Sequence, residues 1–183
     1  GLVGSEMCIR DSIYTDGYFP DARKSENEEP RIGGVAFARW CHAPVAFSTE
    51  IPHEVANTWL PRKTQIIMIE ALALPVAAET FRDLIRGRNV LWLVDSDPVL
   101  GAAVKGHSAR EDVCSGITSF WEIIREEGAK VYLDRIPTDG NLSDGPSRAS
   151  WREAGQCGWA TVSAKIPASL SIAAQGMRQI GRE

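Results

Sequence analysis

What this chain lacks narrows the range of its functions before any motif is considered. No apolar run approaches the roughly 18 residues that a membrane-spanning helix needs, so we expect no contact with a membrane. Four cysteines without close pairs exclude a disulfide framework and a cysteine zinc site, and they favour an intracellular setting. The formal net charge of −4 also excludes a strongly basic, DNA-coating type of protein.

The length and composition indicate one folded domain, with or without a tail. At 183 residues and 44% hydrophobic content, the chain can bury a core of ordinary size. Residues 1–12 are treated separately, because Leu2 to Asp11 resembles one translated frame of a transposon adapter used in sequencing libraries. We therefore expect residues 1–12 to be an artefact, and the natural reading frame to extend upstream of Ile13.

The order of hydrophobic patterns predicts an α/β fold. β-rich runs at residues 13–19, 31–39 and 43–48 predict an antiparallel meander, and helical periodicity begins near residue 64. A buried strand over 90–94, helices over 98–105 and 111–127, and a strand over 129–136 follow. This order predicts a five-stranded mixed sheet, three antiparallel strands then two parallel, with helices on both faces, over residues 13–148. Residues 149–183 have poor periodicity and are predicted to be a C-terminal tail of unknown role.

Four acidic residues occupy positions where acidic residues are unusual. Asp16 lies within an apolar strand pattern, Glu70 within the apolar stripe of a helix, and Asp95 at the end of a buried strand. Asp144 follows the last predicted strand. A buried carboxylate costs several kcal/mol unless a cation or hydrogen bonds compensate it, and no basic residue is spaced to neutralise all four. A divalent metal, which prefers carboxylate oxygens, is the economical explanation.

Simpler interpretations exist for two of these residues, Asp16 and Asp144, when each is taken alone. Asp16-Gly17 is also a turn dipeptide, and Asp144-Gly145-Pro146 could cap and end a helix. Asp97, which precedes Pro98, is interpreted as a helix-capping residue rather than a metal ligand. The placement of all four carboxylates on suitable elements favours the metal hypothesis.

At these residues the chain resembles the ribonuclease H superfamily, and within it the ribonuclease H domains of retroelement reverse transcriptases. The resemblance is carried by four segments: Ile13 to Gly17, Gln65 to Leu72, Val94 to Ser96, and Asn141 to Arg148. That family places an Asp in a first strand, a Glu on the first long helix, an Asp after the fourth strand and an Asp after the fifth.

The resemblance implies a specific activity. It implies that Asp16, Glu70, Asp95 and Asp144 hold two Mg²⁺ or Mn²⁺ ions and hydrolyse the RNA strand of an RNA–DNA hybrid. Contacts with this substrate are expected from four further residues: Gly17, Asn141, Arg148 and Lys105. An upstream reverse transcriptase domain of the same polyprotein is the expected protein partner.

The chain also departs from the family, and this leaves one alternative open. Residues 136–140 contain no catalytic-loop histidine, and no basic substrate-binding helix is present. A catalytically inert ribonuclease H-like connector domain therefore remains the alternative, since a fold does not guarantee an activity.

Other enzyme classes fit less well. In an integrase or transposase the Glu would come last, and a proofreading exonuclease would have Asp-x-Glu in the first strand. A serine hydrolase elbow and a phosphate-binding loop are both missing.

Overall fold

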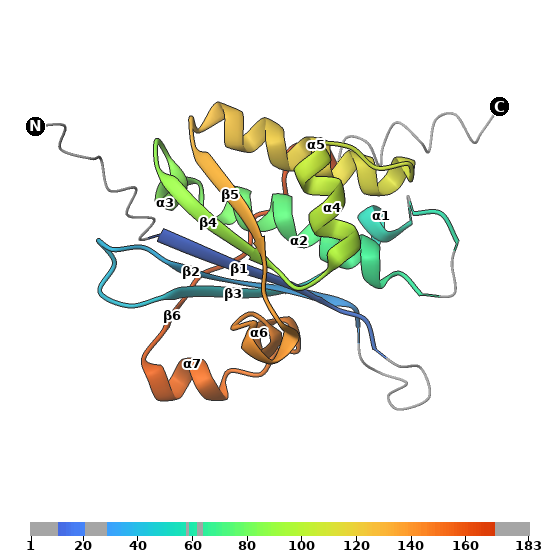
Figure 1. The fold of residues 1–183 in the computed structure, drawn as a ribbon. Coiled ribbons are helices and arrows are strands. Elements are labelled where there is room, and N and C mark those ends of the chain that lie inside the picture. Colours follow the sequence, from blue (N-terminus) through green and yellow to red (C-terminus); the bar gives the residue numbers. More distant parts are fainter. Residues whose placement is uncertain (1–10, 21–28, 58, 62–63, 171–183) are drawn as a thin grey trace, which may run out of the picture.

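A mixed β-sheet forms the centre of the protein (Figure 1). The computed structural model describes residues 11–20, 29–57, 59–61 and 64–170. Within them the sheet has six strands in the order β5-β4-β1-β2-β3-β6. The strands are β1 (Asp11–Tyr18), β2 (Arg31–Phe37), β3 (Val45–Glu50), β4 (Asn89–Val94), β5 (Lys130–Arg135) and β6 (Ala160–Thr161).

The strand directions agree with the predicted topology. β1, β2 and β3 pair antiparallel, whereas β4 pairs parallel with both β1 and β5. β4 is buried from Trp92 to Val94, which explains its nearly continuous apolar sequence, because a central parallel strand is covered on both faces. The predicted antiparallel-then-parallel sheet is confirmed, and β6 is the additional strand.

Helices cover both faces of the sheet. They are α1 (His53–Ala56), α2 (Ile66–Thr80), α3 (Arg82–Ile85), α4 (Asp97–Lys105), α5 (Glu111–Glu126), α6 (Asp144–Ser147) and α7 (Arg152–Cys157), with a 3-10 turn, η1 (Thr138–Gly140). Figure 1 shows α2, α4 and α5 on one side of the sheet and α6 and α7 on the other. None of the helices in the described ranges is long and apolar enough to cross a membrane.

Helix α2 lies between the sheet and α5 and is surrounded by protein. Every residue from Met68 to Ala78 is buried except Glu70. The sequence predicted a one-sided apolar stripe, but the helix is apolar around its whole circumference because it packs against a partner on each side. Glu70 is therefore the only charged residue in the buried part of this helix.

The C-terminal segment packs against the domain. After α7, β6 pairs parallel with β3, and the amide of Val162 donates to the carbonyl oxygen of Ala46 at 3.0 Å. The chain then reaches α2, where the Lys165 amide donates to Thr80 Oγ1 at 2.9 Å, and Leu170 is buried in the core. The predicted tail thus contributes a helix, a strand and core contacts up to residue 170. A two-residue strand has no detectable periodicity, which is why the sequence did not reveal β6.

The N-terminal limit of the fold also differs in detail from the prediction. β1 begins at Asp11, inside the segment that we set aside, and the Asp11 carboxylate accepts a hydrogen bond from the Arg39 amide at 3.1 Å. Residues 1–10 lie outside the described residues, so the artefact interpretation stays a prediction.

Candidate active site

The register of two parallel strands brings Asp16 and Asp95 together. Thr15 of β1 is opposite Val94 of β4. The residues that follow them in the sequence are Asp16 and Asp95, so these two aspartates lie at the same end of the paired strands. Asp16 is 6% exposed, and Asp95 follows the last residue of β4. The sequence hypothesis required these two strands to be neighbours, and the structure fulfils that requirement.

Helix α2 brings Glu70 to the same end of the sheet. A Cβ atom at Gly17 would lie 2.7 Å from the Glu70 backbone nitrogen, so the glycine allows β1 and α2 to approach closely at this point. The hydroxyl group of Ser96, a buried residue directly after Asp95, hydrogen-bonds the Glu70 carboxyl group. Gly17, which we predicted to contact substrate, is buried and acts in packing here.

The segment between β5 and α6 positions Asp144. The amide nitrogen of the buried Asn141 side chain donates to the carbonyl oxygen of Thr15 at 3.2 Å. Its amide oxygen accepts from the Ser143 hydroxyl group at 2.6 Å. Both ends of the Asn141 side chain are bonded within the protein, where they tie this segment to β1. The predicted contact of Asn141 with substrate stays a prediction.

Helix α6 sits directly on strand β2. A Cβ atom at Gly33 would collide with the Ser147 backbone nitrogen and with Pro146, so only glycine permits this contact. Gly33 pairs with Asp16 across β1 and β2, which places α6 over Asp16. The Ser147 hydroxyl donates to Asp16 Oδ2 at 2.5 Å.

Arg148 lies at the edge of the same group of residues. Its Nε donates to Asp144 Oδ1 at 2.9 Å, and its guanidinium carbon lies 4.6 Å from the centroid of the Tyr18 ring. Both side chains of this ion pair are partly exposed, so solvent screens their interaction. Arg148 thus forms an ion pair with one of the four candidate carboxylates, and within the described part of the chain the other three have no ion pair with Lys or Arg.

The four carboxylates interact electrostatically. Burial raises the pKa of Asp16 to about 6; the Ser147 hydrogen bond opposes the rise, and repulsion from Asp95 and Asp144 adds to it. Burial likewise raises the pKa of Glu70 to about 7, with further contributions from Asp95 and Asp16. Asp16 thus interacts electrostatically with each of the other three carboxyl groups.

The donor atoms suit a divalent cation that is completed by water and substrate. Asp95 Oδ1 is, among the described residues, the one buried side-chain oxygen or nitrogen without a hydrogen-bond partner. Within those residues, no three His, Cys, Asp or Glu side chains are grouped closely enough to hold a metal by themselves. Mg²⁺ usually takes one or two carboxylates plus water and phosphate oxygens, so a preformed cage is not required. An unpaired buried carboxylate oxygen beside two desolvated carboxyls fits such an ion.

Two further residues from the sequence analysis, Lys105 and Asp97, lie on helix α4. Lys105 is exposed in the last turn of α4, about 12 Å along the helix axis from Asp97 at its start. Asp97 is 71% exposed and forms a 2.6 Å ion pair with Arg135. The capping prediction for Asp97 is wrong, because Ser96 is the N-cap residue of α4 and Asp97 is the first residue of the helix. Lys105 as a substrate contact stays a prediction.

Sequence reasoning missed three residues that shape the site. Ser147 hydrogen-bonds Asp16, and Ser96 hydrogen-bonds Glu70. Gly33 lets α6 pack directly against β2. The Gly33-Gly34 pair within a strand was a detectable signal, since glycine in a strand often marks a close approach of another backbone. Serines near helix ends are common, so Ser96 and Ser147 gave no usable signal.

The raised pKa values predict how the stability of the protein depends on pH in EDTA. A carboxyl with a raised pKa holds its proton more tightly in the folded chain, so its ionisation destabilises the fold. We expect the free energy of unfolding to lose contributions from Asp16 and Glu70 as pH rises from about 4 to about 7. One pKa unit corresponds to about 1.4 kcal/mol, so the Asp16 contribution is on the order of 3 kcal/mol. Urea unfolding at pH values from 4 to 8 measures it.

The control for this experiment is the double variant Asp16→Asn, Glu70→Gln, whose side chains do not ionise. Its free energy of unfolding should rise relative to that of the wild type as pH increases. A wild-type-to-variant difference that is the same at every pH would contradict the electrostatic description of the site. Other groups, such as Glu127 with its pKa lowered by Arg86 and Arg82, act equally in both proteins.

Comparison with known proteins agrees with this geometry at the level of the fold. No protein-family model matches the chain. No curated protein sequence matches it either. Three solved structures with this architecture are similar to it at 14–16% identity. RNase H1 from Halobacterium salinarum NRC-1 has a TM-score of 0.54 at 16% identity, with 75% of this chain and 93% of that chain covered.

The other two structures give the same result. The N-terminal RNase H domain of a Mycobacterium tuberculosis protein has a TM-score of 0.55 at 14% identity, covering 81% and 97% of the two chains. LC11-RNase H1, in complex with an RNA/DNA hybrid, has a TM-score of 0.55 at 16% identity, covering 79% and 98%. The chain therefore has the ribonuclease H-like fold.

Proposed function

We propose that this protein is a metal-dependent endonuclease that hydrolyses the RNA strand of RNA–DNA hybrids. The observation that carries the proposal is the unpaired, buried Oδ1 of Asp95 beside Asp16 and Glu70, two carboxyls that burial and mutual repulsion make hard to ionise. A protein with no use for this arrangement would be more stable with apolar or neutral residues there. The ribonuclease H-like fold supports the proposal.

In this proposal Asp16, Glu70, Asp95 and Asp144 hold two Mg²⁺ or Mn²⁺ ions. When bound, the two metals would activate the attacking water and stabilise the departing 3′ oxygen of the phosphodiester. The protein holds the four carboxylates near one another, partly desolvated, at one end of the sheet. Arg148 would then be free to exchange its partner Asp144 for a substrate phosphate, since its guanidinium is half exposed.

The proposed substrate is distinguished by its shape and its 2′-hydroxyl groups. RNA-containing duplexes expose these groups in a wide, shallow minor groove, whereas DNA has none. One of the similar structures, LC11-RNase H1, is in complex with an RNA/DNA hybrid. From the sequence motifs we further propose that the chain belongs to an intracellular retroelement polyprotein, with a reverse transcriptase domain upstream as its partner.

Cleavage of an end-labelled RNA–DNA hybrid by the full chain tests this function. We expect the RNA strand alone to be cut with Mg²⁺ or Mn²⁺, and no cutting with EDTA or by the Asp16→Asn variant. The melting temperature of the wild type should also rise with Mn²⁺, because an ion that binds only the folded state stabilises it. A folded chain without cleavage and without a Mn²⁺-dependent rise would contradict the enzyme hypothesis and favour the inert connector.

A further inference from the structure

Ser147 connects two of the candidate carboxylate residues through one buried hydroxyl group. Its Oγ donates to Asp16 Oδ2 at 2.5 Å and also lies 2.9 Å from the backbone carbonyl oxygen of Asp144. Ser147 is 0% exposed, so water has no access to take over the hydrogen bond to Asp16. A charge-assisted hydrogen bond of this length is among the stronger interactions available to a carboxylate.

The surrounding backbone fixes the position of this hydroxyl group. The Ser147 amide donates to the Ser143 carbonyl oxygen at 2.9 Å, and Ser143 is itself held by Asn141. On its other side, Ser147 touches β2 at Gly33, where no side chain separates the two backbones. The hydroxyl group therefore approaches Asp16 from a rigid helix end and has little freedom to follow the carboxylate if it rotates.

We propose that Ser147 is a positioning residue of the metal site: its buried hydroxyl group donates to Asp16 Oδ2 and so fixes the orientation in which that carboxylate binds the cation. This inference rests on the proposed function, because it concerns how Asp16 binds Mg²⁺ or Mn²⁺. Partners of this kind orient metal ligands, and their loss typically lowers metal affinity about 10- to 100-fold. Ser147 itself contacts neither metal nor substrate in this proposal.

The test compares the Mn²⁺ affinity of the wild-type full chain with that of Ser147→Ala by isothermal titration calorimetry. We expect the affinity of the variant to be about 10- to 100-fold weaker, with an unchanged circular dichroism spectrum. Ser147→Cys is the second variant, because a thiol fills the same space but is a poor donor. It should weaken Mn²⁺ binding in the same direction if the hydrogen bond, rather than the volume, matters.

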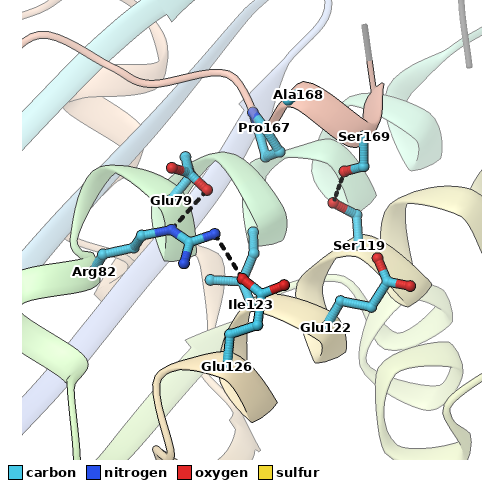
Figure 2. Close-up of a pocket in the computed structure, with 9 residues that line it drawn as sticks. All are labelled: Glu79, Arg82, Ser119, Glu122, Ile123, Glu126, Pro167, Ala168 and Ser169. Atoms are coloured by element: carbon cyan, nitrogen blue, oxygen red, sulfur yellow. Dashed lines mark hydrogen bonds and ion pairs between the residues drawn. The ribbon is translucent and has the colours of Figure 1, made fainter. Parts of the chain in front are cut away.

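Ser119 offers a matched control in a pocket that none of the four candidate carboxylates lines. It is also a buried serine, and Figure 2 shows its hydroxyl group bonded to that of Ser169, at 2.8 Å, beside a pocket of about 230 Å³. In that pocket Arg82 bridges Glu79 and Glu126. Ser119→Ala removes one buried hydroxyl group without touching a candidate carboxylate, so Mn²⁺ affinity should stay at the wild-type value.

A double-mutant cycle separates positioning from a purely structural role. If Ser147 acts through Asp16, Ser147→Ala should change Mn²⁺ affinity much less in an Asp16→Asn background than in the wild type. Equal effects in both backgrounds, or wild-type affinity in a folded Ser147→Ala protein, would overturn the inference. A wild type that binds no Mn²⁺ would instead overturn the proposed function together with it, and that result is visible before any variant is made.

Discussion

Replacing Asp95 with Asn should abolish hydrolysis of the hybrid while the protein stays folded. The substitution changes one oxygen for an amide nitrogen and removes the negative charge, at the position whose buried Oδ1 has no hydrogen-bond partner among the described residues. An amide is a poor ligand for a hard divalent cation in such a site, so the RNA strand should remain intact at the detection limit of a gel assay. The variant should also be at least as stable as the wild type in EDTA, because a buried charge next to Asp16 and Glu70 is gone.

Asp97→Asn is the matched control, since it makes the same chemical change two residues away. Asp97 is exposed and pairs with Arg135 on the surface, so we expect most of the activity to remain and stability to fall by no more than about 1 kcal/mol. An active Asp95→Asn protein would contradict the metal assignment. An inactive but folded Asp97→Asn protein would mean that the wrong aspartate has been placed in the site.

Replacing Gly33 with Ala should damage both the fold and the activity. The added methyl group would meet the backbone of Ser147 and Pro146, which cannot rotate away as a flexible side chain could. Overpacking of this kind costs about 1–3 kcal/mol, and relief requires α6 to move away from β2. Because Asp144 and Ser147 belong to α6, a shift of about 1 Å should lower activity by about 100-fold. Urea unfolding and the hybrid cleavage assay measure the two effects.

Gly101→Ala provides the comparison for this substitution. Gly101 lies within α4, and a Cβ atom there would meet no atom within 4 Å. The change should stabilise the protein by roughly 0.5–1 kcal/mol, because alanine loses less conformational freedom than glycine in a helix. Unchanged activity and stability in Gly33→Ala would show that α6 is not seated on β2 in the way the structure describes.

Local sequence patterns identified some residues of the candidate site but not the structural roles of others. Asp16, Glu70 and Asp95 were found from the sequence because each breaks a local hydrophobic pattern, and such a break needs no knowledge of distant residues. The roles of Gly17 and Asn141 were not found in this way. Gly17 lets α2 approach β1 and Asn141 ties its segment to Thr15, and both roles depend on residues distant in the sequence. Their expected contacts with substrate stay predictions.

The sequence by itself determined the kinds and order of the elements from β1 to β5 that build the sheet and its main helices, and the four acidic positions, because hydrophobic period and composition act over a few neighbouring residues. Only the tertiary structure decided which side chains hydrogen-bond to residues distant in the sequence. Asp16 bonds Ser147 across 131 positions of the chain, and Asn141 bonds Thr15 across 126. The strand register and the β2–α6 contact bring these hydrogen-bonded groups together. No local sequence pattern encodes the register between distant strands. The same reason explains β6, which is a strand only because β3 offers it an edge.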